Sequence, residues 1–282
     1  MKVNLAASAG FCFGVRRAIN IAMQTAKNKK PVFMLGDIVH NEEVVRQIQR
    51  AGIKKIYRLS AKGKEKLLLI RAHGCSRDTL RKAKKLGYLI IDATCPMVKE
   101  IHAIAKKLEN NGSKIIVIGD KTHDEVKGIV GQLETKAIII ERLENMPLKR
   151  IKSIEKAGVV VQSTQNMDKV RQILDILRKN IRKVEFHNTI CKPTRSKQNE
   201  VKVMPLENKV MIIIGSKTSA NTKRIYEISK SLNNNSYWVN SSKEIKLNWL
   251  SKAKSVGITA GASTPASTIQ KVIQKIRAFP AA

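Results

Sequence analysis

Three cysteines, Cys12, Cys95 and Cys191, stand in short polar or glycine-containing segments that are typical of turns. Cys12 lies in a segment bounded by two glycines, which let a backbone approach a bulky object closely. Pro96 follows Cys95 and suits the first turn of a helix, whose amides stabilise a thiolate. A single cysteine of this kind is most often a buried, inert thiol. Three of them in turns after strands favour a shared metal centre.

The spacing of the cysteines limits the kind of metal centre. The chain has four cysteines and no Cys-x-x-Cys pair, so it lacks the patterns of ferredoxins and zinc ribbons, and the fold must assemble any site. Three thiolates suit a four-iron four-sulfur cluster with one open iron. Zinc held by three cysteines and a histidine is the alternative, although its ligands usually come in close pairs. We interpret the fourth cysteine, Cys75, as a packed thiol.

Three histidines, His40, His73 and His123, each follow an apolar run closely. A lone histidine at such a place is usually a hydrogen-bonded structural residue. Three in equivalent places predict an anion-binding set that donates to phosphate oxygens. Glu125 is a candidate proton donor, because the pKa of a carboxyl group rises in a closed, dry site. A helix N-terminal charge that complements the dipole is an equally good interpretation of Glu125.

Two loops of small hydrogen-bonding residues, 216–222 and 261–265, lead into stretches expected to be helical. Backbone amides at the start of a helix bind anions, so these loops predict further anion contacts. Helix N-caps alone prefer the same residue types, however. Neither loop contains the Gly-x-x-x-x-Gly-Lys-Ser/Thr pattern of P-loops or the Gly-x-Gly-x-x-Gly pattern of dinucleotide-binding folds. The sequence therefore does not indicate nucleotide chemistry.

The elements that must position these residues repeat one pattern: an apolar run, a polar turn and an amphipathic stretch. Runs such as 67–70, 115–118 and 210–214 suit buried parallel strands, and 76–86 and 168–179 suit helices. This alternation predicts an α/β fold with mainly parallel sheets, in which ligands bind beyond the carboxyl ends of the strands.

Similar lengths of chain separate Cys12 from Cys95 and Cys95 from Cys191. This spacing predicts three similar lobes that each supply one thiolate. The predicted lobes are residues 14–95, 96–191, and 192–282 together with 1–13. No apolar stretch approaches the roughly 20 residues needed to span a bilayer. A reducing compartment favours thiols or metal ligation over disulfides. We therefore expect a cytoplasmic protein.

The chain is strongly basic, with 54 Lys and Arg against 22 Asp and Glu and a formal net charge of +32. Such an excess is an electrostatic footprint of nucleic-acid binding. The basic residues are spread along the whole chain, however, and the few aromatic residues are not interleaved with them for base stacking. We interpret the charge as a generally basic surface that attracts an anionic substrate and an acidic redox partner.

Together, these motifs resemble one family closely: 4-hydroxy-3-methylbut-2-enyl diphosphate reductase, the last enzyme of the non-mevalonate isoprenoid pathway. The matching segments extend over nearly the whole chain in the family's order, which makes the resemblance highly specific. They are residues 10–15, 39–41, 72–74, 92–96, 123–126, 162–164, 189–191, 215–221 and 259–263.

The resemblance implies an oxidoreductase that removes the allylic hydroxyl of its substrate, using two electrons and protons, to give isopentenyl and dimethylallyl diphosphates. It implies three lobes around a central four-iron four-sulfur cluster with one open iron, held by Cys12, Cys95 and Cys191. Glu125 matches the proton-delivering glutamate. The implied electron donor is of the ferredoxin or flavodoxin type, and neither nucleic acid nor a membrane is expected as a partner. The implied substrate-binding positions are His40, His73, His123, Ser163, Thr164, Thr194, Ser219, Ala220, Asn221 and Ser263.

The chain departs from the family's pattern at several of these motifs. Ala220 stands where a second serine is usual, and losing one diphosphate hydrogen bond costs about 1.5–3 kcal/mol if nothing replaces it. Asp124 replaces a common proline and puts a second carboxylate beside Glu125. Arg71 and Cys75 stand where serine and valine are familiar. The net charge is also more basic than expected of the family.

Two other functions are compatible with the same residues. One is a basic nucleic-acid-binding protein in which the cysteines hold a structural metal. The other is a cluster enzyme of the dehydratase kind, with no net electron input. Only the reductase needs an external reductant and consumes the allylic diphosphate.

Overall fold

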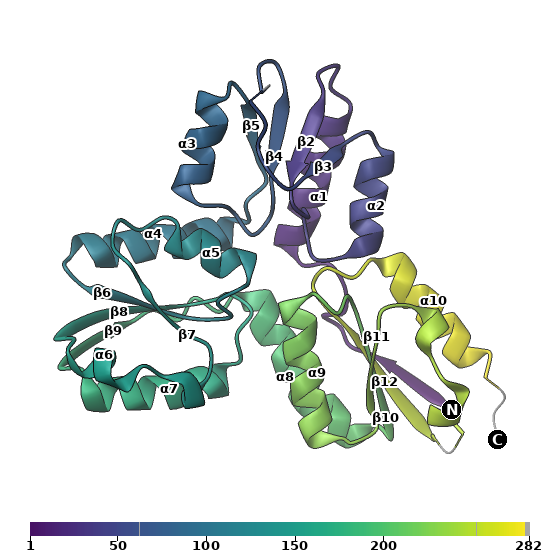
Figure 1. Ribbon diagram of the computed structural model, residues 1–282. Coiled ribbons are helices and arrows are strands. Elements are labelled where there is room, and N and C mark those ends of the chain that lie inside the picture. Colours follow the sequence, from purple (N-terminus) through teal and green to yellow (C-terminus); the bar gives the residue numbers. More distant parts are fainter. Residues whose placement is uncertain (62, 252, 280–282) are drawn as a thin grey trace. The chain divides into compact units, whose positions relative to one another are not determined.

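Parallel strands alternate with helices throughout the part of the chain that the structure, a computed structural model, describes: residues 1–61, 63–251 and 253–279. Within these residues the strands form three four-stranded sheets whose neighbouring strands all run parallel (Figure 1). The predicted α/β class with mainly parallel sheets is confirmed. None of the helices in these ranges combines the length and hydrophobicity of a transmembrane span.

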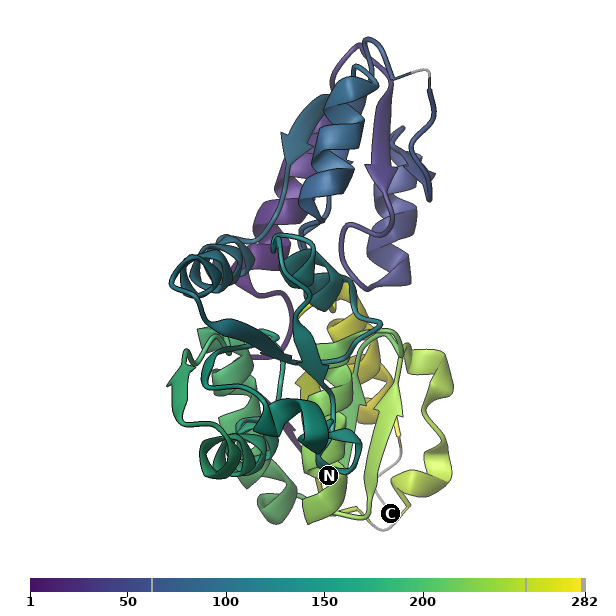
Figure 2. The same cartoon turned by 60° about the vertical axis from the view of Figure 1, so that its left-hand side comes forward.

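The first sheet has the strand order β3-β2-β4-β5. Its strands are β2 (Val32–Leu35), β3 (Lys54–Ile56), β4 (Leu67–Ile70) and β5 (Leu89–Asp92). All four residues of β4 are buried, as expected for a central parallel strand that is covered on both faces. The flanking helices (Figures 1 and 2) are α1 (Phe13–Ala26), α2 (Glu42–Arg50) and α3 (Arg77–Lys85).

The second sheet has the strand order β7-β6-β8-β9. Its strands are β6 (Lys114–Ile118), β7 (Ile138–Ile140), β8 (Lys156–Val161) and β9 (Lys183–Phe186). Its helices are α4 (Pro96–Asn110), α5 (Asp124–Val130), α6 (Leu148–Lys152) and α7 (Met167–Asn180), with a short 3-10 helix, η1 (Leu143–Asn145). Figure 1 shows α4 and α5 on one face and α6 and α7 on the other. Successive residues of β6 point to opposite faces, so Ile115 and Val117 pack beneath α4 and α5, whereas Ile116 and Ile118 pack against α7.

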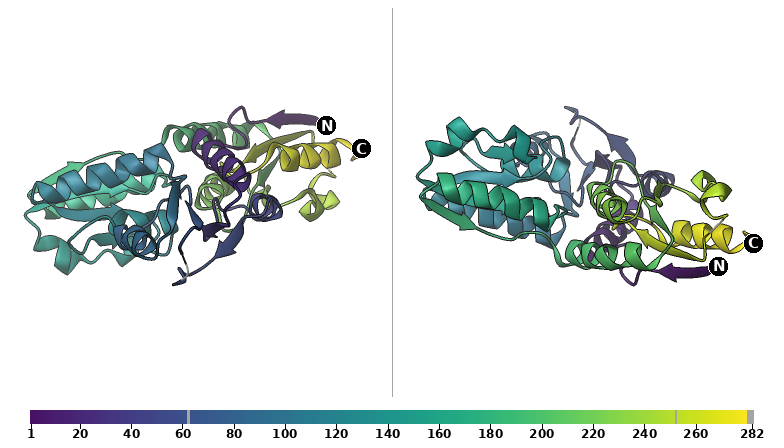
Figure 3. Two further views of the ribbon diagram at one scale, coloured as in Figure 1. Left: turned by 90° about the horizontal axis from the view of Figure 1, so that it is seen from above. Right: turned by 90° about the horizontal axis from the view of Figure 1, so that it is seen from below.

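The third sheet has the strand order β1-β12-β10-β11. Its strands are β1 (Lys2–Leu5), β10 (Val210–Ile214), β11 (Ser236–Val239) and β12 (Ser255–Ala260). Its helices are α8 (Lys192–Glu207), α9 (Ala220–Leu232) and α10 (Ala266–Arg277), with the 3-10 helices η2 (Ser242–Glu244) and η3 (Leu247–Trp249). The amino-terminal strand β1 lies beside β12, so the two ends of the chain build one sheet (Figure 3).

The three sheets repeat one topology. In each of the first two, the first strand lies between the second and third, and the fourth lies outside the third. The third sheet follows the same order, except that β1 takes the place of the fourth strand. The prediction of three similar lobes is confirmed in this sense. The lobe boundaries at residues 95 and 191 stay a prediction.

By compactness the chain divides into two units rather than three. Unit 1 comprises Met1–Arg16, His40–Val45 and Lys192–Ala282, and it contains the third sheet. Unit 2 comprises Arg17–Val39 and Arg46–Cys191, and it contains the other two sheets. The candidate site residues are divided between these units.

Candidate active-site residues in the two units

Glu125, the candidate proton donor, is deeply buried. It lies in the first turn of α5 and is 2% exposed. Its carboxyl oxygens accept hydrogen bonds from the backbone amide of Ser163 at 2.6 Å and from the Ser163 hydroxyl at 2.8 Å. Burial raises the pKa of Glu125 above its ordinary value, with Asp120 adding to the rise and the hydrogen bonds from Ser163 opposing it. A carboxyl group in these surroundings can hold a proton and deliver it.

Ser163 connects Glu125 to one of the candidate metal ligands. It lies in the turn after β8, where its amide and hydroxyl face Glu125. Its carbonyl oxygen accepts from the backbone amide of Cys191 at 3.1 Å. The neighbouring Thr164 hydroxyl accepts from Gln162 at 3.1 Å. This turn of unit 2 therefore brings Glu125, Ser163 and Cys191 together, although they are well separated in the sequence.

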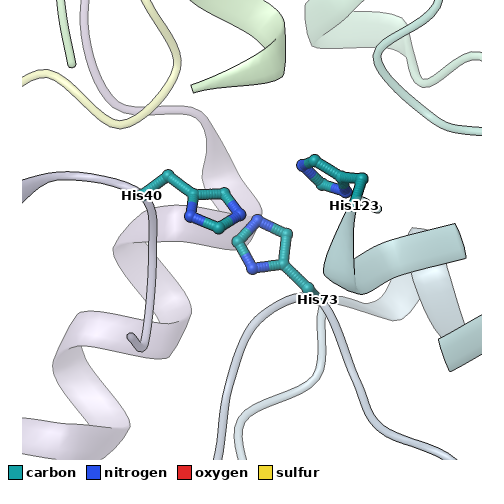
Figure 4. A group of neighbouring side chains, drawn as sticks. All are labelled: His40, His73 and His123. Atoms are coloured by element: carbon teal, nitrogen blue, oxygen red, sulfur yellow. The ribbon is translucent and has the colours of Figure 1, made fainter. Parts of the chain in front are cut away.

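His73 and His123 lie side by side in unit 2 (Figure 4). Their ring centroids are 5.3 Å apart and the rings meet edge to face. His123 is the N-cap of α5, and its Nδ1 accepts from the amide of Glu125 at 3.2 Å. The neutral His123 ring therefore carries its proton on Nε2, which can donate to an anion. His40, labelled in the same figure, belongs to unit 1, and its participation in a set of three stays a prediction.

Each of the three candidate metal-binding cysteines immediately precedes a helix. Cys12 precedes α1, Cys95 precedes α4 as its N-cap, and Cys191 precedes α8. Each of these helices leads into the first strand of the next sheet, so the three thiols occupy equivalent places in the repeated topology. All three are partly exposed. Partly exposed thiols at helix starts are well suited to bind a metal centre as thiolates. Cys12 belongs to unit 1 and the other two to unit 2, so their meeting at one centre stays a prediction.

Cys75 differs from these three cysteines. Burial raises the pKa of its thiol to about 11, with Asp92 contributing to the rise and Arg71 opposing it. The side chain packs against the core of the first sheet, which includes Leu68 and Ile70. A protonated, packed thiol fits the interpretation of Cys75 as a structural residue.

In unit 1, a group of loops at the ends of β10 and β12 gathers the polar residues of both predicted anion loops. Ser219 is the N-cap of α9 and accepts from the amide of Thr222 at 3.3 Å. Ser263 donates its hydroxyl proton to the carbonyl oxygen of His40 at 2.9 Å. The amide of Cys12 donates to the carbonyl of Ala262 at 3.1 Å. The Cys12, His40 and Ser263 segments are therefore joined by hydrogen bonds within this unit.

Asn221 carries the clearest sign of a ligand in unit 1. The residue is only 4% exposed, yet within the described residues neither its side-chain oxygen nor its nitrogen has a hydrogen-bond partner. Burying an unpaired amide is costly, and buried amides normally have partners. The neighbouring Ala220 is also buried and offers no hydroxyl. Thr194, another candidate, is buried in the first turn of α8.

Two of the departures from the family's pattern pair with each other. The Arg71 guanidinium and the Asp124 carboxylate form an ion pair of 2.5 Å, with side chains 19% and 22% exposed. Arg71 precedes the His73 turn, whereas Asp124 lies beside Glu125 in α5. The second carboxylate is therefore neutralised by Arg71. This pairing was not predicted from the sequence, because the two residues are 53 positions apart.

The sequence did not single out two further basic side chains, one of them partly buried and the other fully buried. His102 lies against the His73 turn, where a Cβ on Gly74 would be 2.9 Å from its ring. Burial lowers the pKa of His102 to about 4, so its ring is neutral at pH 7. Lys197 is buried in unit 1 beneath the Cys12 segment. No local pattern distinguishes it from the exposed lysines of the chain.

Nearly the whole chain is similar to known proteins. A family model described as LytB protein matches residues 3–277. The 4-hydroxy-3-methylbut-2-enyl diphosphate reductase of Campylobacter fetus subsp. fetus is 39% identical over 277 residues, which cover 98% of this chain and 97% of the relative. The enzyme of the same name from Campylobacter curvus is 37% identical over 280 residues, covering 99% of this chain and 100% of the relative.

Solved structures of enzymes with this activity have the same fold. A structure of (E)-4-hydroxy-3-methyl-but-2-enyl diphosphate reductase, the terminal enzyme of the non-mevalonate pathway, is 36% identical with a TM-score of 0.71, covering 98% of this chain and 99% of the other. The E-1-hydroxy-2-methyl-but-2-enyl-4-diphosphate reductase of Plasmodium falciparum is 29% identical with a TM-score of 0.88, covering 97% of this chain and 87% of the other.

Proposed function

The chain belongs to the LytB protein family, and on this premise we propose how its residues carry out the family's reaction. Its activity is that of its relatives, the reduction of 4-hydroxy-3-methylbut-2-enyl diphosphate in the terminal step of the non-mevalonate pathway. It is an oxidoreductase of an iron–sulfur family, and its substrate is an allylic diphosphate. The products expected from this substrate are isopentenyl and dimethylallyl diphosphates.

The cluster in this proposal is a four-iron four-sulfur cluster bound by Cys12, Cys95 and Cys191, with one iron open. The equivalent positions of the three thiols, each directly before a helix, support this ligand set. When bound, such a cluster supplies a reducing and Lewis-acidic centre. A permanent fourth protein ligand would block it, and the packed, protonated thiol of Cys75 is a poor candidate for that role.

The groups that we propose to bind the diphosphate are histidine, serine and asparagine side chains, and the evidence for them comes from each unit separately. In unit 1 these groups are His40, Ser219, Asn221 and Ser263, and the unpartnered buried amide of Asn221 supports an anion there. In unit 2, the Nε2 proton of His123 is of the kind that donates to a phosphate oxygen, and the His73 ring lies beside it. Amides and imidazoles donate to phosphate oxygens readily, which makes this donor set chemically suitable.

Glu125 delivers the proton that lets the allylic hydroxyl leave as water. The observation that carries this assignment is the burial of Glu125, which raises its pKa against the opposing hydrogen bonds from Ser163 and keeps it able to hold a proton. The hydroxyls of Ser163, Thr164 and Thr194 orient the substrate's alcohol in this proposal. Without a proton, hydroxide would have to leave, which is a much poorer leaving group.

Electrons come from an external donor of the ferredoxin or flavodoxin type. The net charge of +32 supports docking of such an acidic partner. A cytoplasmic location stays a prediction from the cysteine chemistry.

The assignment of Glu125 is tested by anaerobic turnover with a chemical reductant. Glu125→Gln keeps the side-chain shape but cannot deliver a proton, and we expect kcat to fall by about 10²–10⁴-fold. Glu100→Gln, an exposed change of the same kind on α4, serves as the matched control and leaves kcat unchanged. Iron and sulfide content is measured for all three proteins. Undiminished turnover in Glu125→Gln would remove Glu125 from this role, and a colourless wild-type protein without iron would contradict the cluster.

A further inference from the structure

Lys197 is one of the largest fully buried side chains in the described part of the chain, at 1% exposed. It lies on α8 in unit 1, six residues after Cys191. Lysine is almost never fully buried unless its charge is compensated, because removing an ammonium group from water is costly. Its surroundings must therefore supply that compensation.

Three backbone carbonyls surround the ammonium group. Lys197 Nζ donates to the carbonyl oxygen of Ser8, and to those of Gly10 and Ala260 at 3.1 Å each. An ammonium group has three N–H donors, so the three carbonyls satisfy it completely. Ser8 and Gly10 lie between β1 and α1, just before Cys12, whereas Ala260 ends β12, just before the Ser263 loop.

A second residue of α8 binds the same segment through the hydrogen-bond donors of that segment. The Glu200 carboxylate accepts from the Ser8 amide at 3.1 and 3.2 Å and from the Ser8 hydroxyl at 2.5 Å. Lys197 thus donates to the carbonyl oxygens of Ser8 and Gly10, whereas Glu200 accepts from the N–H and O–H groups of Ser8. The Gly10 backbone in this segment has φ of +94°, a conformation that side-chain-bearing residues rarely adopt.

The Lys197 charge lies close to the Cys12 segment, because its ammonium group contacts the Gly10 carbonyl two residues before Cys12. Burial lowers the pKa of Lys197 to about 8, whereas favourable interactions with Cys12 and Glu200 work against the decrease. The ammonium form therefore still predominates at pH 7. Salt screens such a buried positive charge much less than it screens the charge of a surface lysine.

We propose that Lys197 is a positioning residue for Cys12, whose ammonium group fixes the Ser8–Gly10 segment and keeps a positive charge on the Gly10 carbonyl, two residues before Cys12. This inference rests on the proposed role of Cys12 as a cluster ligand. A nearby cation stabilises the more negative, reduced form of an iron–sulfur cluster and so raises its reduction potential. Lys197 thereby contributes to the reaction through Cys12 without touching the substrate.

The test uses the full-length protein with its cluster reconstituted. Lys197→Met removes the charge and the donors at similar length, and Lys202→Met makes the same change at an exposed position of α8. We expect a more negative midpoint potential in Lys197→Met, measured by an anaerobic redox titration followed by electron paramagnetic resonance. We also expect loss of iron to a chelator to be roughly tenfold faster, the size expected for losing one hydrogen bond from a charged donor. Lys202→Met should match the wild type in both measurements.

Lys197→Gln keeps the test usable if Lys197→Met does not fold, because it retains two N–H donors without the charge. Its potential should also be more negative than that of the wild type. Potentials and iron loss in both Lys197 variants equal to those of Lys202→Met would overturn the proposal. That result differs from a failure of the proposed function, which would appear first as a wild-type protein without a cluster or without turnover.

Discussion

Glu125 and Lys197 are both buried ionisable residues, but their surroundings assign them opposite tasks. Burial raises the pKa of Glu125 and lowers that of Lys197, so it favours the neutral form in each case. Among the residues that the structure describes, the two donors of Ser163 are the hydrogen-bond donors that favour the charged form of Glu125, and Glu125 can hold a proton for transfer. Lys197 has three carbonyls and remains an ammonium ion at pH 7. A buried ionisable group whose charged form has few hydrogen-bond partners can exchange a proton. One whose charged form is fully hydrogen-bonded stays charged and serves a structural role.

The largest expected effect that tests this contrast is on stability. Lys197→Met leaves three buried carbonyls without their donor, and we expect it to lower the free energy of unfolding by about 3 kcal/mol. Glu125→Gln keeps an acceptor for Ser163 and should change it by roughly 1 kcal/mol or less. Urea denaturation of the iron-free proteins, with Lys202→Met as control, measures both. Equal losses for the two variants would break the contrast.

The pH dependence of turnover sharpens the Glu125 side of the contrast. Only the protonated carboxyl can donate, so kcat should fall by about tenfold per pH unit above the raised pKa of Glu125. The hydrogen bonds from Ser163 favour the carboxylate and thus lower this pKa. Ser163→Ala removes one of them, so the pKa rises and the descending limb of the profile should move to higher pH. A descending limb at unchanged or lower pH would show that a group other than Glu125 titrates.

Ala220 offers a smaller test on the side of unit 1, where binding rather than proton transfer is expected. Ala220→Ser restores a hydroxyl next to Asn221, and one added hydrogen bond should lower KM by roughly three- to tenfold with kcat little changed. Steady-state kinetics with the allylic diphosphate measure both constants. An unchanged KM would mean that the diphosphate does not contact this turn, or that the hydrogen bond is already replaced.

The smallest expected effect concerns the ion pair beside Glu125. Arg71 and Asp124 are partly exposed, so their interaction should contribute roughly 0.5–1 kcal/mol. A double-mutant cycle with Arg71→Ser, Asp124→Asn and the double variant, followed by urea denaturation, isolates this coupling. The double variant should lose less stability than the sum of the single changes. Full additivity would show that the two departures from the family's pattern are independent.

Local sequence signals predicted much of the fold. The aliphatic runs at 67–70, 115–118 and 210–214 are strands of parallel sheets, and the helix expected over 168–179 is α7, Met167–Asn180. The helix expected over 76–86 is α3, Arg77–Lys85, with Ser76 as its N-cap. These signals are readable because burial periodicity, capping and turn chemistry act over a few neighbouring residues. The family motifs added the activity, which spacing alone left open.

The sequence by itself determined which groups were available for chemistry: thiols before helix starts, histidines after strands, and a glutamate in the first turn of a helix. Only the tertiary structure decided how those groups are compensated. Ser163 and Glu125 meet across 38 residues, Arg71 and Asp124 across 53, and Lys197 and Gly10 across 187. The solvation of a charged group and its hydrogen-bond partners depend on atoms that the whole fold brings near. A short stretch of sequence therefore does not reveal which glutamate or which lysine is buried.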